Sequence, residues 1–111
     1  MITEDYVSFE VAKLLKEKGF SELTAKAYPY FEGKDYKYDI SCPTLQMAMK
    51  WLREVYNLFI DTYYDCDFGE GYRFSVHKLP KGTTLESHNE NYSTYEQACE
   101  AAIKYCLENL I

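Results

Sequence analysis

The chain has 111 residues, of which 47% are hydrophobic and 27% charged, and its formal net charge is −6 at pH 7. This length allows a single domain spanning residues 1–111, and no apolar run approaches the roughly 20 residues of a membrane helix. Without such a run we expect no membrane partner. Because nucleic-acid phosphates are bound mainly by lysine and arginine, the negative charge disfavours direct nucleic-acid binding.

The chain starts with "MITEDYVSFE", which carries acidic residues where a secretory signal carries basic ones, so we expect a cytoplasmic protein. A helix is predicted in residues 7–20, with Ser8 near its start and Gly19 beyond its end. Residues 25–40 then read as two short strands. Since Pro29 cannot donate a ladder hydrogen bond, its strand should lie at the edge of a sheet.

A second helix is predicted in residues 42–57, with Pro43 or Thr44 in its first turn. Met47 and Trp51 lie four residues apart on this helix. That spacing could suit a pair that stacks on a cofactor, but it is far more typical of plain core packing. We therefore expect both side chains in the core and no cofactor.

The last helix is predicted in residues 93–111, and Ser93 to Glu96 has the pattern of a capping box at its start. Its buried stripe at helical spacing contains Cys99, Ile103, Cys106, Leu107 and Leu110. On one helix Cys99 and Cys106 would lie about 10 Å apart, too far for a mutual disulfide. The four cysteines form no C-x-x-C pair, so we expect reduced thiols that pack as small apolar groups.

Residues 61–74, "DTYYDCDFGEGYRF", fit either a metal-binding loop or the tip of a hairpin. A calcium loop of the EF-hand type that began at Asp65 would need a glutamate at its twelfth position, where Val76 stands. A looser divalent site made by Asp65, Asp67 and Glu70 stays open, but an ordinary solvated turn is the commoner outcome. We therefore expect no bound metal.

A hairpin fits better, because two β-rich runs flank a three-residue loop, Asp67–Gly69, whose last position suits a left-handed glycine. The loop places Cys66 opposite Glu70 and fixes the register of the strands. One face then pairs Tyr64 with Tyr72, Thr62 with Phe74 and Ile60 with Val76, and should be buried. The other face pairs Tyr63 with Arg73, Asp61 with Ser75 and Phe59 with His77. A cation–π contact between Arg73 and Tyr63 is expected there.

This second face is the candidate site, because it gathers five polar and aromatic side chains on one surface: Asp61, Tyr63, Arg73, Ser75 and His77. The plainer interpretation is a solvated sheet face, which antiparallel sheets commonly have. Ser75 and His77 suggest a nucleophile and a base, but a triad also needs an oriented base and an oxyanion hole, and no such motif surrounds them. We expect no catalytic residue and no enzymatic activity.

Residues 80–92 are predicted to be a polar connector with turn formers at Pro80, Gly82 and Asn89. The complete pattern predicts one α+β domain in the order α-β-β-α-β-β-α. Its sheet should be mainly antiparallel, contain about four strands and pack against the helices.

Three helical segments, "YVSFEVAKLLKEKGF", "CPTLQMAMKWLREVYN" and "YSTYEQACEAAIKYCLENLI", resemble a group of short uncharacterised α+β proteins of gut Bacteroidales genomes and their mobile elements. The resemblance covers a little under half of the chain. Since no activity is assigned to that group, no functional residue is carried over. What the resemblance implies is a small intracellular accessory protein of phage or conjugative origin.

The 12 tyrosines suggest half-buried sheet faces or a contact surface, because tyrosine combines an apolar ring with a polar tip. We expect a non-enzymatic interaction module that uses a tyrosine-rich, acidic sheet surface to bind another protein or itself as a homodimer. The alternative is a small-molecule-binding domain, with a pocket between sheet and helices lined by tyrosines and anchored by Arg73 and His77.

Overall fold

The computed structural model describes residues 2–67, 69–87 and 90–111, so Phe68 of the predicted loop and Asn89 of the predicted connector lie outside the described residues. The elements in chain order are α1 (Phe9–Glu17), β1 (Lys26–Glu32), β2 (Asp35–Cys42), α2 (Leu45–Tyr56), β3 (Leu58–Asp65), β4 (Gly71–Lys78), β5 (Thr83–Ser87), α3 (Tyr95–Tyr105) and the π-helical turn η1 (Cys106–Leu110). Among the described residues, no helix has both the length and the apolar character needed to cross a lipid bilayer.

The first helix is bounded by the residues that the sequence predicts, whereas the second begins one residue later than predicted, at Leu45. Ser8 caps α1 by accepting a hydrogen bond from the Val11 N–H, and Gly19 follows the helix with a φ of +102°. Thr44 caps α2 in the same way, and Asn57 ends it in the left-handed conformation with a φ of +58°. Asn57 is the single residue between α2 and β3, and its left-handed conformation turns the chain from helix into strand.

The capping box of α3 lies one residue later than predicted. Thr94, not Ser93, is the N-cap, and its hydroxyl accepts from the Gln97 N–H at 3.1 Å. Gln97 reaches back and accepts from the Ser93 N–H at 3.1 Å. The sequence Thr-Tyr-Glu-Gln fits the capping pattern as well as Ser-Thr-Tyr-Glu does, so the pattern alone could not choose between the two.

The α+β class and the packing of helices against sheet are confirmed, but the strands form two separate antiparallel sheets, β1-β2 and β3-β4-β5. The predicted connector was wrong in part, because Thr83–Ser87 pairs with β4 as a fifth strand. Its sequence, "TTLES", is polar and short, and a register shift interrupts its four paired positions with β4. It therefore lacks the apolar alternation that signals a strand.

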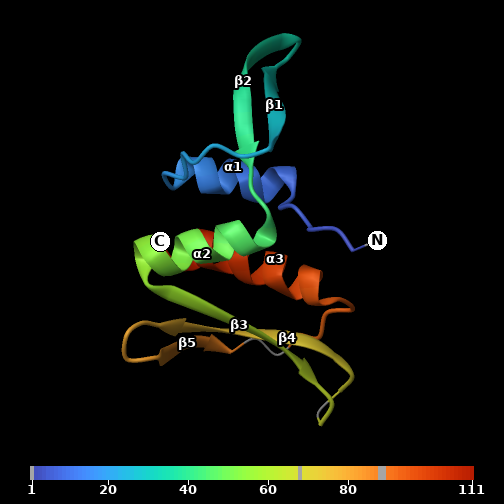
Figure 1. Ribbon diagram of the computed structural model, residues 1–111, viewed down its shortest axis with the longest axis vertical. Helices are drawn as coiled ribbons and strands as arrows, with labels where there is room; N and C mark the ends of the chain where they lie inside the picture. Colours follow the sequence, from blue (N-terminus) through green and yellow to red (C-terminus); the bar gives the residue numbers. More distant parts are fainter. Residues whose placement is uncertain (1, 68, 88–89) are drawn as a thin grey trace.

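The elements stack along the long axis of a molecule that measures 50 × 33 × 27 Å. Figure 1 shows the three-stranded sheet at one end, α2 and α3 across one of its faces, α1 beyond these helices and the β1–β2 hairpin projecting past α1. Buried apolar side chains from the sheet and all three helices form one cluster, which includes Leu15, Leu52, Phe74, Val76 and Ile103. The stripe of Cys99, Ile103, Cys106 and Leu107 is buried, as predicted.

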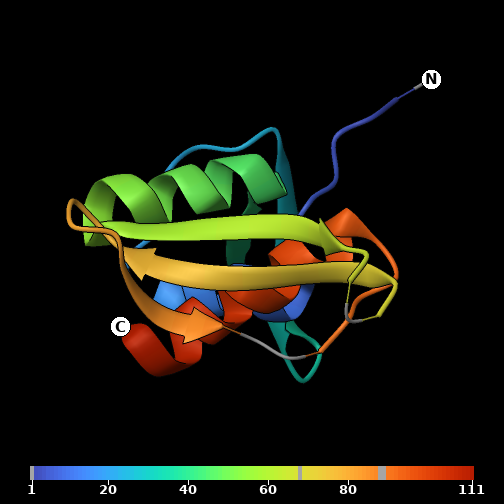
Figure 2. The same ribbon diagram turned by 90° about the horizontal axis from the view of Figure 1, so that it is seen from below.

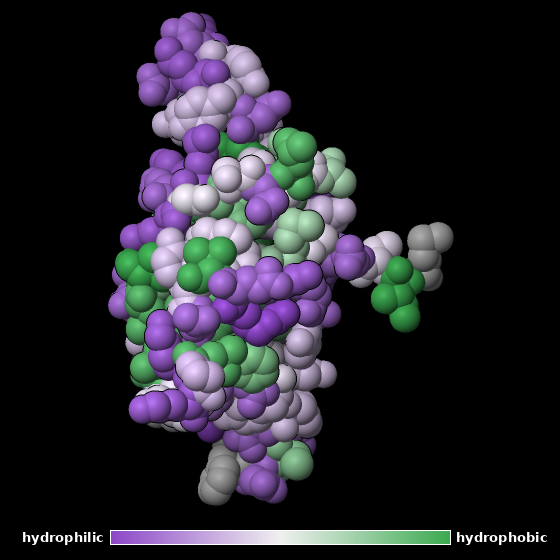
Figure 3. Space-filling view, turned by 60° about the vertical axis from the view of Figure 1, so that its left-hand side comes forward, coloured by the Kyte–Doolittle hydropathy of each residue, from purple (hydrophilic) through white to green (hydrophobic). Residues whose placement is uncertain are grey.

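The β1–β2 hairpin is buried only near its base, at Ile40 and Cys42. Farther out, Tyr30 stacks on Tyr38 with ring centroids 5.1 Å apart, and the ammonium of Lys16 lies 4.4 Å from the Tyr38 ring. On the side seen in Figure 3, the distal part of this projecting hairpin shows hydrophilic and neutral colours only. The Pro29 prediction is confirmed, because its strand is an edge of a two-stranded sheet.

Candidate interaction surface

The predicted register of the second hairpin is confirmed over the whole of β3 and β4. Tyr63 pairs with Arg73, Asp61 with Ser75 and Phe59 with His77. The ladder ends at Asp65 and Gly71, so the predicted pair of Cys66 with Glu70 lies beyond it. Gly69 has a positive φ of +132°, as the predicted turn requires.

The five predicted site residues lie on the sheet face that no described helix covers. In Figure 2 the three strands lie in front of the helices and turn this face toward the viewer. We call it the open face and define it by the outward side chains of the three strands: Phe59, Asp61, Tyr63, Asp65, Arg73, Ser75, His77 and Thr84. Phe59 and Tyr63 are each 37% exposed, and Asp61 is exposed.

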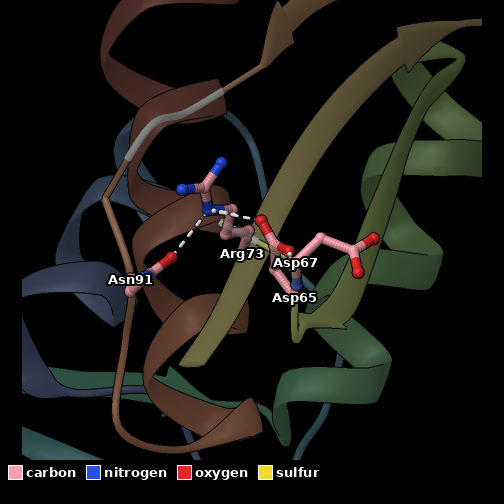
Figure 4. A network of polar contacts seen from close by, with 4 residues as sticks. All are labelled: Asp65, Asp67, Arg73 and Asn91. Carbon is pink, nitrogen blue, oxygen red and sulfur yellow. Dashed lines mark hydrogen bonds and ion pairs between the residues drawn. The ribbon is translucent and has the colours of Figure 1, made fainter. Parts of the chain in front are cut away.

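Arg73 does not stack on Tyr63, so the expected cation–π contact is wrong. Its Nε lies 3.1 Å from Asp65 Oδ2 and donates to Asn91 Oδ1 at 2.6 Å, as Figure 4 shows. The side chains of Arg73 and Asp65 are only 18% and 11% exposed. Asp65 also accepts from the Asp67 N–H at 2.9 Å. This carboxylate therefore connects the hairpin tip to Arg73.

Asn91 comes from the segment that leads into α3, and it fits closely against the hairpin. A Cβ on Gly69 would lie 2.6 Å from Asn91 Nδ2, and one on Gly71 would lie 2.8 Å from Asn91 Cβ. Next to it, Tyr92 and Tyr72 exchange two backbone hydrogen bonds of 2.9 and 2.8 Å. Gly71 thus allows a close approach that a side chain would prevent, whereas a side chain at Gly69 would require the Asn91 amide to move.

Ser75 and His77 form a hydrogen-bonded chain with a residue that the sequence did not single out. Ser75 Oγ lies 3.0 Å from His77 Nε2, and His77 Nδ1 lies 3.1 Å from Thr84 Oγ1 on β5. The base is therefore oriented, which is one requirement of a nucleophile–base pair. However, Ser75 is only 7% exposed and lies flat in a β-ladder, so its hydroxyl is poorly placed to reach a substrate carbonyl.

The cysteines do not add a nucleophile to the open face. Burial raises the pKa of Cys106 to about 12, and burial also raises the pKa of Cys99 and of Cys42. A thiol reacts as its thiolate, so these three buried groups are unreactive near neutral pH. This agrees with the prediction that Cys99 and Cys106 pack as small apolar groups. Cys66 is exposed and follows β3 directly.

A second, smaller apolar surface lies away from the sheet. A cavity of about 290 Å³ is lined by Phe20, Leu23, Met47 and Trp51, with charged residues at its rim. Trp51 packs edge-on against Phe20 at 5.4 Å, as a core residue should, but Met47 is 40% exposed, so its expected core position is wrong. Among the described contacts, this cavity has no hydrogen-bonded polar network comparable to that of the open face.

In the described parts of the chain, no group of three or more histidine, cysteine, aspartate or glutamate side chains is placed to hold a metal ion. Comparisons of the sequence with protein-family models and with curated proteins, and of the fold with solved structures, gave no match. The geometry of the open face is therefore the basis for a functional proposal.

Proposed function

We propose that this protein is a non-enzymatic interaction module whose open face binds another protein or a second copy of the chain. The observation that supports this most is the state of the polar groups on that face. Ser75, His77 and Thr84 bond to one another, while Arg73 bonds to Asp65 and Asn91. Covering polar groups costs little free energy when their partners are already inside the protein.

The exposed groups on the same face are those that contribute to binding. Phe59 and Tyr63 offer large rings on rigid strands, and aromatic side chains are favoured at the centres of protein contacts. Asp61 is exposed beside them, and the chain carries a net charge of −6. We therefore propose a partner with a basic surface, which the acidic charge would attract and orient.

The alternative, a small-molecule pocket between sheet and helices, requires Arg73 and His77 as its polar anchors. Arg73 and His77 lie on the sheet face opposite to the helices. They therefore cannot line a pocket on the helix side, and no other observation favours that function. The cytoplasmic location and the accessory role implied by the family resemblance stay predictions.

The test uses two adjacent tyrosines that point to opposite faces of β3. Immobilised wild-type protein, Tyr63→Ala and Tyr64→Ala would be compared in capturing proteins from a lysate of the host cell, with mass spectrometry as the readout. We expect basic proteins to be retained by the wild type and by Tyr64→Ala, and retention to fall about tenfold or more with Tyr63→Ala. Equal capture by all three proteins would contradict a role for the open face.

A further inference from the structure

The second half of the free edge of β3, from Asp61 to Asp65, is the one strand edge of the described chain without a proline, a lysine, a bulge or a covering helix. β1 carries Pro29. In β2 a register shift leaves Lys37 without an opposite residue on β1. β5 has only five residues and a bulge in its pairing with β4. β3 has eight residues, no proline, no lysine and an unbroken register. Proteins usually blunt such edges, so an unprotected one suggests a partner strand.

The hydrogen-bond pattern shows which groups this edge presents. Tyr72 directs its N–H and C=O away from β3, toward Tyr92. Antiparallel partners alternate between bonded and non-bonded pairs, so Tyr64, opposite Tyr72, must direct its own N–H and C=O outward. The Leu79 N–H bonds to Asn57 O at 2.9 Å, which fits the same alternation at the other end. Thr62 is two residues from Tyr64 and therefore also faces outward.

Only half of the edge is accessible. Ile60 is 8% exposed and Leu58 is 2% exposed, whereas Tyr64 is 51% exposed. Figure 1 shows α2 running beside the first half of β3. The accessible groups are therefore the N–H and C=O of Thr62 and Tyr64, which are centred on Tyr63.

We infer that two copies of the chain pair along β3, antiparallel about a twofold axis at Tyr63. In this register Thr62 of one copy exchanges both backbone hydrogen bonds with the partner's Tyr64, and the reverse pair is equivalent. The two three-stranded sheets then form one six-stranded sheet with a continuous open face. Tyr63 meets its own copy at a non-bonded pair, where side chains approach most closely.

The charges along β3 and its neighbours favour this antiparallel arrangement. The acidic residues of the second hairpin gather at its tip, where Asp67 and Glu70 are exposed. Exposed lysines, Lys78 and Lys81, lie at the other end of the same hairpin. A twofold axis at Tyr63 places the acidic tip of each copy beside the basic end of the other, whereas a parallel arrangement would place like charges together.

One kind of pair in this register is unfavourable and occurs twice because of the twofold axis, and it provides a test. Asp61 comes opposite the partner's Asp65, and like charges directly opposite destabilise a sheet. Arg73 already compensates the charge of Asp65 through their ion pair, which limits the repulsion between the two aspartates. Asp61→Asn should therefore tighten the dimer several-fold, whereas a dimer formed elsewhere would not respond.

The decisive experiment compares Tyr64→Pro with its matched control Tyr64→Ala. Both variants lose the ring, but only proline removes the outward N–H, and it leaves the β3–β4 ladder intact. Solution mass would be measured by light scattering at concentrations up to about 1 mM, with circular dichroism as the check of folding. We expect the wild type and Tyr64→Ala to dimerise with rising concentration, and Tyr64→Pro to dissociate at concentrations about tenfold higher or more.

A wild-type monomer at every concentration would overturn the inference and leave the edge to a strand of another protein. A dimer that persists unchanged in folded Tyr64→Pro would also overturn it. If that variant does not fold, amide exchange of the wild type decides: the amides of Thr62 and Tyr64 should slow with concentration, while those of Asp61 and Tyr63 should not. The proposed function is tested separately, since Tyr64→Pro leaves the open face intact for capture.

Discussion

The two hairpins of this protein are built from similar residues but are stabilised in different ways. Both are rich in tyrosine and turn at a glycine with positive φ, Gly33 in the first and Gly69 in the second. In the second hairpin, every other residue of β4 faces the helices, and Phe74 and Val76 are almost fully buried. In the first hairpin, no residue of β1 is buried. Strand propensity forms both hairpins, but a helix-covered face brings much of the second one into the core, whereas the first contributes to the core only at the base of β2.

The largest loss of stability should follow the removal of Phe74, a core side chain of the second hairpin. Phe74 is 1% exposed and packs near Tyr92 and Tyr105. Phe74→Ala should lower the free energy of unfolding by about 3–5 kcal/mol, because it removes a large ring and leaves a cavity. Urea denaturation followed by circular dichroism measures this loss. A loss below about 1 kcal/mol would mean that the second hairpin is as loosely held as the first.

A smaller effect is expected from the Asp65–Arg73 ion pair within the second hairpin, whose arginine also bonds to Asn91 in the segment before α3. Asp65→Asn removes the charge that Arg73 contacts and should cost about 2 kcal/mol, the range for hydrogen bonds to charged groups. The control is Glu32→Gln, because the Glu32–Lys37 pair of the first hairpin is solvent-exposed and 3.9 Å long. We expect no measurable change from the control. An equal loss of unfolding free energy in both variants would show that the ion pairs of the two hairpins contribute equally to stability.

The first hairpin should respond locally rather than globally. Tyr30→Ala breaks the stack on Tyr38 and should cost about 1 kcal/mol within the hairpin, with little effect on the main unfolding transition. The buried thiol of Cys42, at the base of β2, reports such opening. Its labelling by a thiol reagent should become faster, whereas Cys99 should stay protected. Faster labelling of both thiols would instead show global destabilisation.

The smallest effect concerns a single cation. Lys16 lies over the Tyr38 ring at 4.4 Å, and Lys16→Gln should weaken the hairpin by about 0.5 kcal/mol. Amide exchange across β1 and β2 is sensitive enough to detect this change. The same substitution at Lys50 is the control, because that lysine lies on α2, away from the first hairpin. An identical response to both substitutions would show that the contact with Tyr38 contributes nothing.

The register of the second hairpin could be predicted because its alternation leaves only one arrangement that buries Ile60, Phe74 and Val76 together. That register also places Asp65 diagonally across from Arg73, so their ion pair could have been found before the structure. The contact of Arg73 with Asn91 could not, because it depends on the path of a segment outside both strands. The bond from His77 to Thr84 likewise required β5.

The separation of the two sheets was also beyond the sequence. Each hairpin is a local structure, whereas the position of one relative to the other depends on α1 and α2. Glu10 and Lys104 show the same limit. Glu10 is exposed and Lys104 is half-buried on separate predicted helices, yet their side chains pair at 2.9 Å and join α1 to α3. The apolar and polar periodicity within a helix or strand predicts which of its faces is buried. Which two elements contact each other depends on their packing in the folded protein.

The turn of the first hairpin has a practical consequence for studying this molecule. Gly33 and Lys34 are exposed and lie at the far end of the long axis from the three-stranded sheet (Figure 1). An added Cβ at Gly33 would meet no atom within 4 Å. A fluorescent group or an epitope tag inserted in this turn would stay clear of both the open face and the β3 edge. This turn is therefore a suitable attachment site for immobilising the protein in a known orientation.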